Sequence, residues 1–377
     1  MINFLILLFI VLLIHYSIFL ISVLRGLLKL KHVEVKRPLK ELISIIIPFR
    51  NEEENILKNL KSIEAQNYPI DKFEIIYVDD SSTDNSLQIL KSSIQNKNIK
   101  ILSIPDNFEK TARKKKAVNF GIENSAGDIV VATDADCIHS SNWLMNLLSS
   151  FDDKTGFVSG PVELINGGKI FSSLQQLEFA GLILTGAGLI EIGQPVICNG
   201  ANIAYRKNVF KSLNGFEDQF HISSGDDGFL MQKIHKSKKY SVRFCLNRDA
   251  VVKTKPLDSV LQFYHQRKRW ASKNIFYNDK KLIFKLGLIF LFYLSLVGHL
   301  VLGLFLSNKF FIFLAASLLI KFLLEFLILK MGKDILFSNL KLKYFLLAEF
   351  FQIPYIIISS IAGLFGNFVW KGRIIKR

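Results

Sequence analysis

The chain has 377 residues, of which 50% are hydrophobic, and its formal net charge is +16. With a mean hydropathy of +0.30 it is too apolar for an ordinary soluble enzyme. The three cysteines lie far apart and form no CxxC pair, which excludes a disulfide framework and a zinc site of the usual spacing. The Lys and Arg residues cluster beside the apolar segments, so we predict contact with membrane lipids and no nucleic-acid partner.

The first apolar segment, residues 4–24, carries no formal charge apart from a possible one on His15. Roughly 20 apolar residues span a bilayer as a helix. A cleaved signal peptide is the alternative, but no basic residue precedes the segment and no small-x-small cleavage site follows it. We therefore predict a retained N-terminal anchor over residues 1–28.

The sequence from residue 42 onward alternates between short apolar runs and amphipathic stretches. The runs predict strands over 42–48, 73–80, 99–104 and 128–134. The stretches between them predict helices over 52–66, 83–95, with Thr83 or Asp84 as N-cap, and 114–125. Such alternation implies right-handed crossovers and a parallel sheet that is covered on both faces.

Polar residues follow three of these strands, where a parallel sheet binds its ligands. The first strand is followed by Arg50 and Glu52, the second ends on Asp79 and Asp80, and the fourth leads into Asp134 and Asp136. We expect these residues to be neighbours at one edge of the sheet. No GxGxxG follows the first strand, so the dinucleotide fingerprint is missing.

Asp134 and Asp136 are two carboxylates one residue apart on a loop, "GDIVVATDADC". Hard oxygen ligands suit Mg²⁺ or Mn²⁺, which proteins commonly share with substrate phosphates. Helix capping is the alternative, but Ser140 or Ser141 already suits the N-cap of the next predicted helix. The pair therefore predicts a metal and diphosphate site.

Three further polar motifs each have a structural explanation as well. Asp79 and Asp80 suit contacts to a nucleobase or ribose, but "DDSSTD" is also rich in turn-forming residues. A basic run at residues 113–116 opposes the dipole of the helix it begins, unless it meets a diphosphate. Asp226 and Asp227 enter another predicted helix, either as first-turn acids or as a general base for an attacking hydroxyl.

The segment 262–273, "QFYHQRKRWASK", precedes the C-terminal apolar region. It is explained equally well as an interfacial helix with an anchoring Trp or as the mouth of the site. In the second case Arg269 binds a phosphate and Trp270 stacks on a sugar or lipid.

The C-terminal region contains two apolar segments, 286–306 and 310–329, joined by a tight "SNK" turn. A third, 344–370, is interrupted by polar residues and a proline, and it either spans, bends or re-enters the membrane. The basic flanks place the middle of the chain in the cytoplasm. The basic tail also favours the cytoplasm, which conflicts with four simple spans.

Taken together, these strings resemble family 2 glycosyltransferases, membrane-associated enzymes with the GT-A fold. The resemblance covers about residues 40–275 and rests on "ISIIIPFRNEEENI", "EIIYVDDSSTDNS", "KKKAVNFGI", "GDIVVATDADC", "CNGANIAYRKNVF", "SGDDGFLMQK" and "QRKRW". It implies a nucleotide-sugar donor, with UDP or GDP, and an inverting single displacement.

Carried over by position, the resemblance assigns a role to each motif. The donor's nucleoside would contact Pro48, Arg50, Glu52, Asp79, Asp80 and Lys114. Asp134 and Asp136 match the DxD motif that holds the metal and diphosphate. Asp227 matches the catalytic base in the family's ED pair, with Asp226 as its neighbour. Gln266, Arg269 and Trp270 match the Q-x-x-R-W motif on the acceptor side.

The sequence departs from the family pattern at several positions. Arg50 replaces a common Tyr, Ser81 replaces the Gly of DDGS, the GKxxALN motif lacks its Gly, and Asp226 replaces the Glu of the ED pair. None of these changes removes a catalytic carboxylate. The change at Arg50 leaves open which base is bound.

These observations predict an α/β enzyme with a GT-A catalytic domain and membrane helices at both ends. We expect a cytoplasmic domain over 29–282, including an interfacial helix over 257–280, and a C-terminal membrane region of two or three spans over 283–377. The predicted location is the bacterial cytoplasmic membrane. The acceptor would be a lipid, a lipid-linked molecule or a polysaccharide. Alternatives are a processive polysaccharide synthase, a membrane nucleotidyltransferase and a catalytically silent scaffold.

Overall fold

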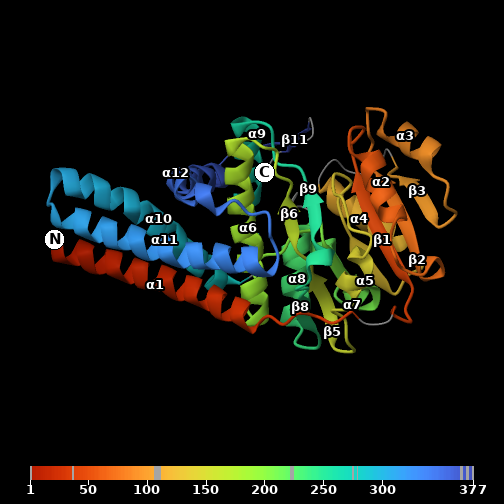
Figure 1. Cartoon of the computed structure of the whole chain (residues 1–377), viewed down its shortest axis with the longest axis horizontal. Coiled ribbons are helices and arrows are strands. Elements are labelled where there is room, and N and C mark those ends of the chain that lie inside the picture. The colour runs from red at the N-terminus through yellow and green to blue at the C-terminus, as the bar shows by residue number, and fades with distance from the viewer. Residues whose placement is uncertain are drawn as a thin grey trace.

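A computed structural model describes residues 2–35, 38–105, 112–220, 225–273, 276–277, 279–365, 368–370 and 373–375. An α/β half built around one sheet and a bundle of long apolar helices lie end to end along the longest axis (Figure 1). The predicted α/β class with helices at both ends of the chain is confirmed.

The core of the α/β half is a seven-stranded sheet. Its strands are β1 (Ile43–Phe49), β2 (Phe73–Asp79), β3 (Ile99–Ser103), β4 (Ile129–Ala132), β5 (Thr155–Ser159), β7 (Ile203–Arg206) and β8 (Ser241–Phe244). The order is β3-β2-β1-β4-β7-β5-β8. The first four strands are parallel, as the alternation predicted, with Ile45 of β1 in register with Ile75 of β2 and Val131 of β4.

The second half of the sheet departs from a purely parallel arrangement. Strand β7 is antiparallel to both of its neighbours, β4 and β5, whereas β5 and β8 are parallel. Two small sheets lie outside it, a parallel pair of β6 (Val162–Leu164) and β9 (Val252–Thr254) and an antiparallel pair of β10 (Phe368–Trp370) and β11 (Arg373–Ile375). The sheet is therefore a mixed sheet in which most neighbouring strands are parallel.

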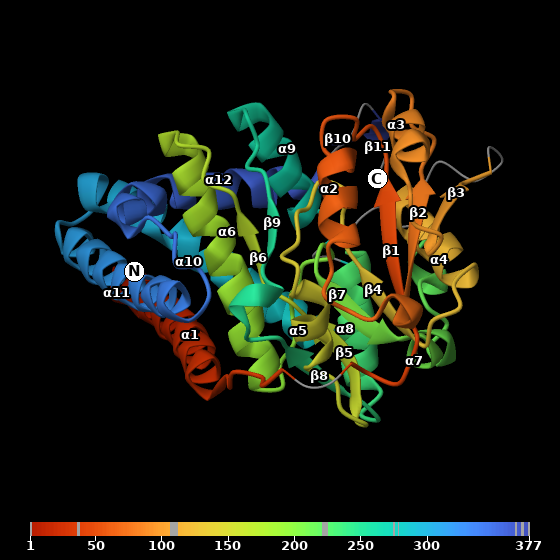
Figure 2. The same cartoon turned by 45° about the vertical axis from the view of Figure 1, so that its right-hand side comes forward.

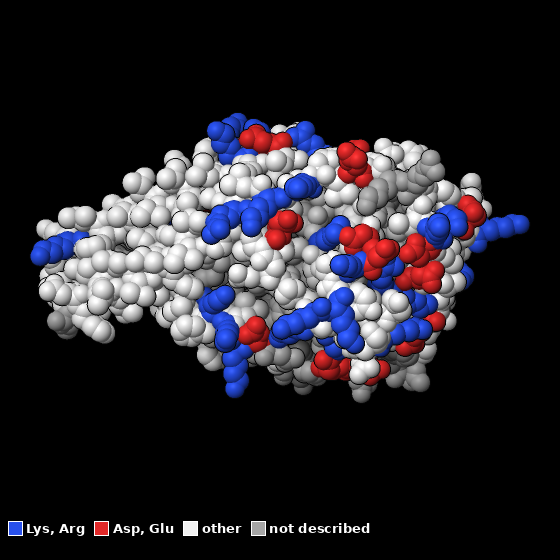
Figure 3. Space-filling view, turned by 90° about the horizontal axis from the view of Figure 1, so that it is seen from below, with Lys and Arg blue, Asp and Glu red and all other residues white. Residues whose placement is uncertain are grey.

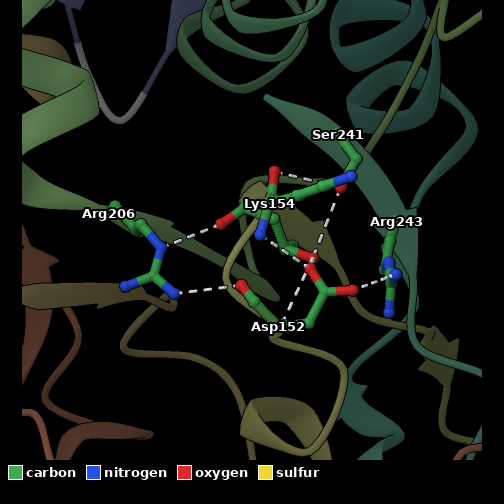
Figure 4. A network of polar contacts seen from close by, with 6 residues as sticks. Asp152, Lys154, Arg206, Ser241 and Arg243 are labelled. Carbon is green, nitrogen blue, oxygen red and sulfur yellow. Dashed lines mark hydrogen bonds and ion pairs between the residues drawn. The ribbon is translucent and has the colours of Figure 1, made fainter. Parts of the chain in front are cut away.

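The ends of β5, β7 and β8 that lie away from the ligand edge are joined by a polar network around Asp152 (Figure 4). Asp152 accepts hydrogen bonds from the Lys154 N–H at 3.0 Å and the Thr155 hydroxyl at 2.7 Å, and it pairs with Arg243 of β8. Arg206 of β7 donates to the Asp152 and Thr155 carbonyls, both at 3.0 Å. The network therefore ties the ends of these three strands to one another.

Helices connect and cover these strands. They are α2 (Ile56–Glu64), α3 (Ser86–Ser93), α4 (Arg113–Glu123), α5 (Trp143–Leu148), α7 (Lys207–Ser212) and α8 (Asp226–Lys236). Two expected caps are wrong, because Asn142 is the N-cap of α5 and Asn85 that of α3. The hydroxyl of Ser140 instead donates to the carbonyl of Asp249 at 2.5 Å, which ties it to a distant loop.

Four helices form what we call the apolar helix bundle. They are α1 (Ile2–Lys29), α10 (Lys280–Phe305), α11 (Lys309–Ile335) and α12 (Phe345–Leu364). Each lies in a helical segment that is long and apolar enough to cross a membrane, the last counted from Leu342. Figure 3 shows that the face of the bundle seen from below is almost without charged side chains, whereas charged side chains are frequent on the same face of the α/β half and the junction.

Two helices, α6 (Ile170–Glu191) and α9 (Val260–Ala271), lie between the bundle and the sheet (Figures 1 and 2). Helix α9 ends sooner than the interfacial segment predicted over 257–280. Helices α1 and α6 cross at two glycines, where a Cβ on Gly26 would lie 1.9 Å from the Gly188 carbonyl oxygen. This close approach needs glycine, because any side chain would force the two backbones apart.

A buried ammonium group holds the apolar helix bundle together. The side chain of Lys321 in α11 is 0% exposed, and its Nζ lies 3.0 Å from Glu325 Oε1, 2.7 Å from Gln352 Oε1 and in contact with Glu349. Tyr16 of α1 donates to Glu325 at 2.6 Å, and its hydroxyl lies 2.9 Å from that of Tyr293 in α10. One cluster therefore joins all four helices.

We predict that Lys321→Met strongly destabilises the bundle, because it leaves Glu325 and Glu349 buried without their cation. Breaking a buried ion pair costs about 3 kcal/mol, whereas removing both partners is much less harmful. The thermal midpoint of the detergent-purified chain should fall, and Lys321→Met with Glu349→Gln should recover part of the loss. A single variant as stable as the wild type would contradict this account.

A second polar cluster makes the stability of the sheet depend on pH. Burial alone would raise the pKa of the Glu74 carboxyl, but hydrogen bonds from Lys100 at 2.7 Å, Ala126 N–H and Ser44 at 2.7 Å lower it below its ordinary value. A lowered folded-state pKa stabilises the fold above the unfolded pKa, and this stability is lost as the pH falls through the folded value.

We therefore expect the thermal midpoint to decrease as the pH falls below about 4.5, and Glu74→Gln to flatten this part of the profile. At neutral pH Glu74→Gln should cost about 2 kcal/mol, the usual contribution of charged hydrogen bonds. Unfolding measured from pH 3 to 7 tests both effects. Parallel profiles for the two proteins would be inconsistent with a role for Glu74.

Candidate active site

A cavity of about 2090 Å³ lies beside the C-terminal ends of β1, β2 and β4 and continues between α6, α9 and the apolar helix bundle. It brings together most of the residues that the sequence singled out. They are Pro48, Arg50, Glu52, Asp80, Lys114, Asp134, Asp136, Asp227, Gln266, Arg269 and Trp270. Asp79 does not line this cavity, and the side chain of Asp226 lies outside the described residues.

The loops after β1 and β2 are fixed to each other by Arg50. Its guanidinium donates to the carbonyl of Asp80 at 2.8 Å and also to that of Ser81. The carboxylate of Asp80 lies 3.4 Å from Arg113 at the start of α4. Asp79 instead accepts the N–H of Ser82 at 2.9 Å. This contact fits the turn, which was one of the two explanations that the sequence offered for this motif.

Ser81 has a positive φ of 55°. Residues other than Gly, Asn and Asp rarely adopt this left-handed conformation. This explains physically why glycine is the expected residue at this position of the motif. The hydrogen bond from Arg50 to the Ser81 carbonyl supports the strained turn in this chain.

The loop after β4 carries the two acids of the DxD motif, and α2 holds its backbone in place. Asn59 donates to the carbonyls of Asp134 at 3.2 Å and Cys137 at 2.8 Å, and it accepts the hydroxyl of Tyr77 at 2.7 Å. A loop with both carbonyls bound in this way presents its side chains in one orientation.

A buried histidine supports the same loop. Burial lowers the pKa of His139 to about 3, so its ring is neutral at physiological pH. Its Nε2 lies 2.8 Å from the hydroxyl of Thr133, which in turn donates to the Ala201 carbonyl at 2.7 Å. His139 is thus a structural residue of the loop, in agreement with the absence of any metal-ligand spacing around it.

The carboxylates of Asp134 and Asp136 differ in their partners. Lys114 of α4 lies 2.6 Å from Asp134 Oδ1, and both side chains are partly exposed, at 26% and 32%. Asp136 accepts the thiol of Cys137 at 3.5 Å, and burial together with the neighbouring Asp136 and Asp134 charges raises the pKa of that thiol well above its ordinary value. The two acids supply oxygen ligands of the kind that Mg²⁺ and Mn²⁺ prefer.

The described residues contain no group of three or more potential metal ligands. Among these described residues, Asp134 and Asp136 are the pair that the DxD loop offers, and a cation bound there would take further ligands such as water or a bound substrate. This agrees with Mg²⁺, which usually keeps waters and shares substrate phosphates. Lys114 would have to exchange its partner when such a ligand binds.

Asp227 lies in the first turn of α8, at another wall of the same cavity. Its Oδ2 accepts the N–H of Gly200 at 2.8 Å, its Oδ1 accepts the N–H of Gly228 at 2.7 Å, and Lys273 Nζ lies 4.0 Å from Oδ1. Gly225, the N-cap, has a φ of 83°, a conformation that glycine adopts without strain. Each carboxylate oxygen retains a lone pair for a hydroxyl donor.

Helix α9 carries the three residues of the Q-x-x-R-W motif into the cavity. Its first turn is capped by Ser259, whose hydroxyl oxygen accepts the N–H of Gln262 at 3.2 Å. The ring of Trp270 lies 6.3 Å from that of Phe179 in α6. The motif therefore faces the part of the cavity that continues towards the apolar helix bundle.

Sequence reasoning missed the residues that orient these side chains. Asn59 binds the Asp134 loop, Gly200 binds Asp227 through its N–H, and Glu178 binds Arg267 of α9. Each partner lies far along the chain, and a single residue within a helix or loop carries no distinguishing pattern. "CNGANIAYRKNVF" contributed only to the overall resemblance, although it contains Gly200.

Comparison with known proteins agrees with this fold. The family description "Glycosyl transferase family 2" matches residues 44–213, and "Glycosyl transferase family group 2" matches residues 129–355. The second match covers more than half of the chain, so the protein belongs to glycosyl transferase family group 2, and the resemblance drawn from the sequence is confirmed.

Two curated proteins illustrate the relationship. A probable glycosyltransferase of Bacillus subtilis, YdaM, is 27% identical over 246 residues, 63% of this chain and 56% of that protein. A poly-beta-1,6-N-acetyl-D-glucosamine synthase of Staphylococcus epidermidis is 25% identical over 252 residues, 65% of this chain and 56% of that protein. The chain thus spans little more than half the length of these relatives.

A solved structure shows the same fold over almost the whole chain. It is a mannosyltransferase from Pyrobaculum calidifontis in complex with GDP-Man and Mn²⁺, with a TM-score of 0.60 and 20% sequence identity. The match covers 96% of this chain and 99% of that one. It confirms the GT-A fold together with the helices at both ends.

Proposed function

We propose that the protein is a membrane-bound inverting glycosyltransferase that moves a sugar from a nucleotide-sugar donor to a hydroxyl of a lipid or lipid-linked acceptor. The observation that carries the proposal is the cavity, which joins the acids and bases of the sheet edge to Asp227, to Trp270 and to side chains of the apolar helix bundle. One continuous space thus offers a polar donor side and a partly apolar acceptor side.

The donor side would hold the nucleoside diphosphate. Arg50, Glu52 and Asp80 would contact the nucleoside, and Lys114 would contact the diphosphate. A Mg²⁺ or Mn²⁺ ion held by Asp136 and Asp134 would neutralise charge on the leaving diphosphate. The mannosyltransferase of similar fold was solved with GDP-Man and Mn²⁺, which makes these the first donor and ion to test.

The acceptor side would use Asp227 as the general base. Its carboxylate is held by two backbone N–H groups, so its position does not depend on a flexible side-chain partner. An acceptor hydroxyl that donates to it can lose its proton as the bond to the sugar forms. Gln266, Arg269 and Trp270 would hold the rest of the acceptor, and Asp226 adjoins the base in sequence.

The membrane setting is proposed from the same features. The four apolar helices and their basic flanks favour the bacterial cytoplasmic membrane, with the α/β half in the cytoplasm. A processive polysaccharide synthase is the second candidate, favoured by the similarity to a poly-beta-1,6-N-acetyl-D-glucosamine synthase.

The test uses the detergent-purified full chain, a lipid extract of bacterial membranes and a panel of radiolabelled GDP- and UDP-sugars. We expect transfer only when Mg²⁺ or Mn²⁺ is present, and loss of transfer on adding EDTA. One lipid-soluble product indicates single transfer, and a ladder of products indicates a processive enzyme. No turnover of any donor would overturn the proposal.

Variants separate the two halves of the mechanism. Asp227→Asn should lower transfer by about 10²-fold or more and leave nucleotide binding intact, because it removes a base. Asp136→Asn should lower both transfer and metal-dependent nucleotide binding, measured by calorimetry. Asp153→Asn changes an exposed acid elsewhere and should match the wild type. Retained transfer in both site variants would show that the mechanism is wrong.

A further inference from the structure

Arg267 lies inside the Q-x-x-R-W motif at a position that the motif leaves open. It is buried, although Arg rarely is, with only 5% of its side chain exposed. Its Nε donates to Glu178 Oε1 at 2.9 Å, and its Nη2 contacts Glu178 Oε2. This is a two-point contact between planar groups, which fixes orientation as well as distance.

The same guanidinium contacts two of the residues that line the acceptor side. Its Nη1 donates to Gln266 Oε1, and its central carbon lies 4.3 Å from the ring centroid of Trp270. Phe263 lies at the same distance, 4.3 Å, from the guanidinium carbon. The orientation of Gln266 and Trp270 is therefore coupled to that of Arg267.

Glu178 is itself held from a third helix. Tyr355 of α12 donates to Glu178 Oε1 at 2.8 Å, and its ring lies 5.3 Å from that of Phe263. One turn earlier in α12, Gln352 accepts from the buried Lys321. Helix α12 thus makes polar contacts both with the interior of the apolar helix bundle and with the residue that holds Arg267.

Packing alone does not require this arrangement. A buried ion pair contributes little net stability relative to apolar side chains of the same volume, because both charges lose their hydration. The planar guanidinium of Arg directs several hydrogen bonds in fixed directions and packs on an aromatic ring at the same time. Neither Lys nor an apolar side chain can do both.

We propose that Arg267, locked by Glu178 and Tyr355, is a positioning residue that sets Gln266 and Trp270 for the acceptor. The proposal rests on the proposed function, because it assumes that α9 faces the acceptor. The contacts described for these three residues reach none of the strand-end residues, so a disturbance here should affect acceptor use and spare the donor side.

The test compares Glu178→Gln and Arg267→Lys with Lys268→Gln, a charge change at the next residue of the same helix. Glu178→Gln keeps the shape of the side chain but removes its charge and one of its two acceptor oxygens. Arg267→Lys keeps the positive charge but removes the planar guanidinium that makes two contacts at once. Each full-length protein is assayed with a radiolabelled nucleotide sugar and a graded series of a bacterial membrane lipid extract. Donor hydrolysis without the extract is measured in parallel.

We expect both site variants to raise the extract concentration that gives half-maximal transfer by about tenfold, since small misplacements of binding groups have effects of this size or larger. Hydrolysis of the donor should change by less than about twofold, because the variants do not move the residues that would position the donor. Lys268→Gln should match the wild type in both assays. A parallel loss of transfer, hydrolysis and thermal midpoint would show a purely structural role and overturn the proposal.

A second readout does not depend on catalysis. The emission of Trp270 is obtained as the difference between each protein and the same protein carrying Trp270→Phe. In both site variants it should shift to longer wavelength and be quenched more strongly by acrylamide. Unchanged emission would overturn the positioning role, whereas absent transfer by the wild type with altered emission in the variants would instead contradict the proposed function.

Discussion

The ammonium group of Lys321 needs anionic or carbonyl partners wherever the apolar helix bundle is surrounded by hydrocarbon. It finds them on α11 and α12, through Glu325, Glu349 and Gln352, while Tyr16 of α1 binds the same cluster. Charges inside such a bundle are costly unless they are paired in its interior. The pairing therefore fixes how the four helices face each other. Helix α12 then presents Tyr355 to Glu178 of α6, so the wall of the cavity depends on the same constraint.

The sheet imposes a different constraint on the other end of the cavity. Parallel strands place the residues after β1, β2 and β4 at one edge, whatever their separation in sequence. The loops there are held mainly by contacts to backbone carbonyls, from Arg50 across to the Asp80 loop and from Asn59 to the Asp134 loop. Because these contacts hold the backbone, the loop after β4 would keep its shape if the proposed cation and diphosphate replaced the present partner of Asp134.

Patterns in the sequence predicted what is local or periodic. The apolar runs and the polar residues after them were enough for β1 to β4, for the edge they share and for the strand-end residues that line the cavity there. Asp227 and the Q-x-x-R-W residues were found through the motifs of the family resemblance instead. The antiparallel β7 was not predictable, because its direction follows from α6, which inserts between β6 and β7 and turns the chain around. Asn85 and Asn142 stand at the N-cap positions of α3 and α5 without a side-chain capping bond. Asp84 accepts the N–H of Ser86 from one residue further out, and Ser140 donates to Asp249 instead.

Long-range partners were beyond sequence reasoning for a simple reason. Gly200 binds Asp227 and Glu178 binds Arg267 through contacts 27 and 89 residues apart, with no periodicity to connect them. From the sequence alone, a single Glu within an apolar helix is equally consistent with three positions. It can face the membrane, lie at the membrane interface or be buried against a partner. Only the crossing of α6 and α9 decides between them.

The ion pairs of the cavity divide into two kinds, and the difference has a functional consequence. Lys114 and Asp134 are 26% and 32% exposed, so their pairing is screened by water and is weak enough to exchange for a diphosphate and a cation. Arg267 and Glu178 are 5% and 8% exposed, and separating them would leave buried charges without partners. Under the proposed function, the donor side would thus be built from contacts that a substrate can replace, and the acceptor side would be framed by contacts that it cannot. Such an enzyme would accept and release its nucleotide while the orientation of Trp270 towards the acceptor stays the same.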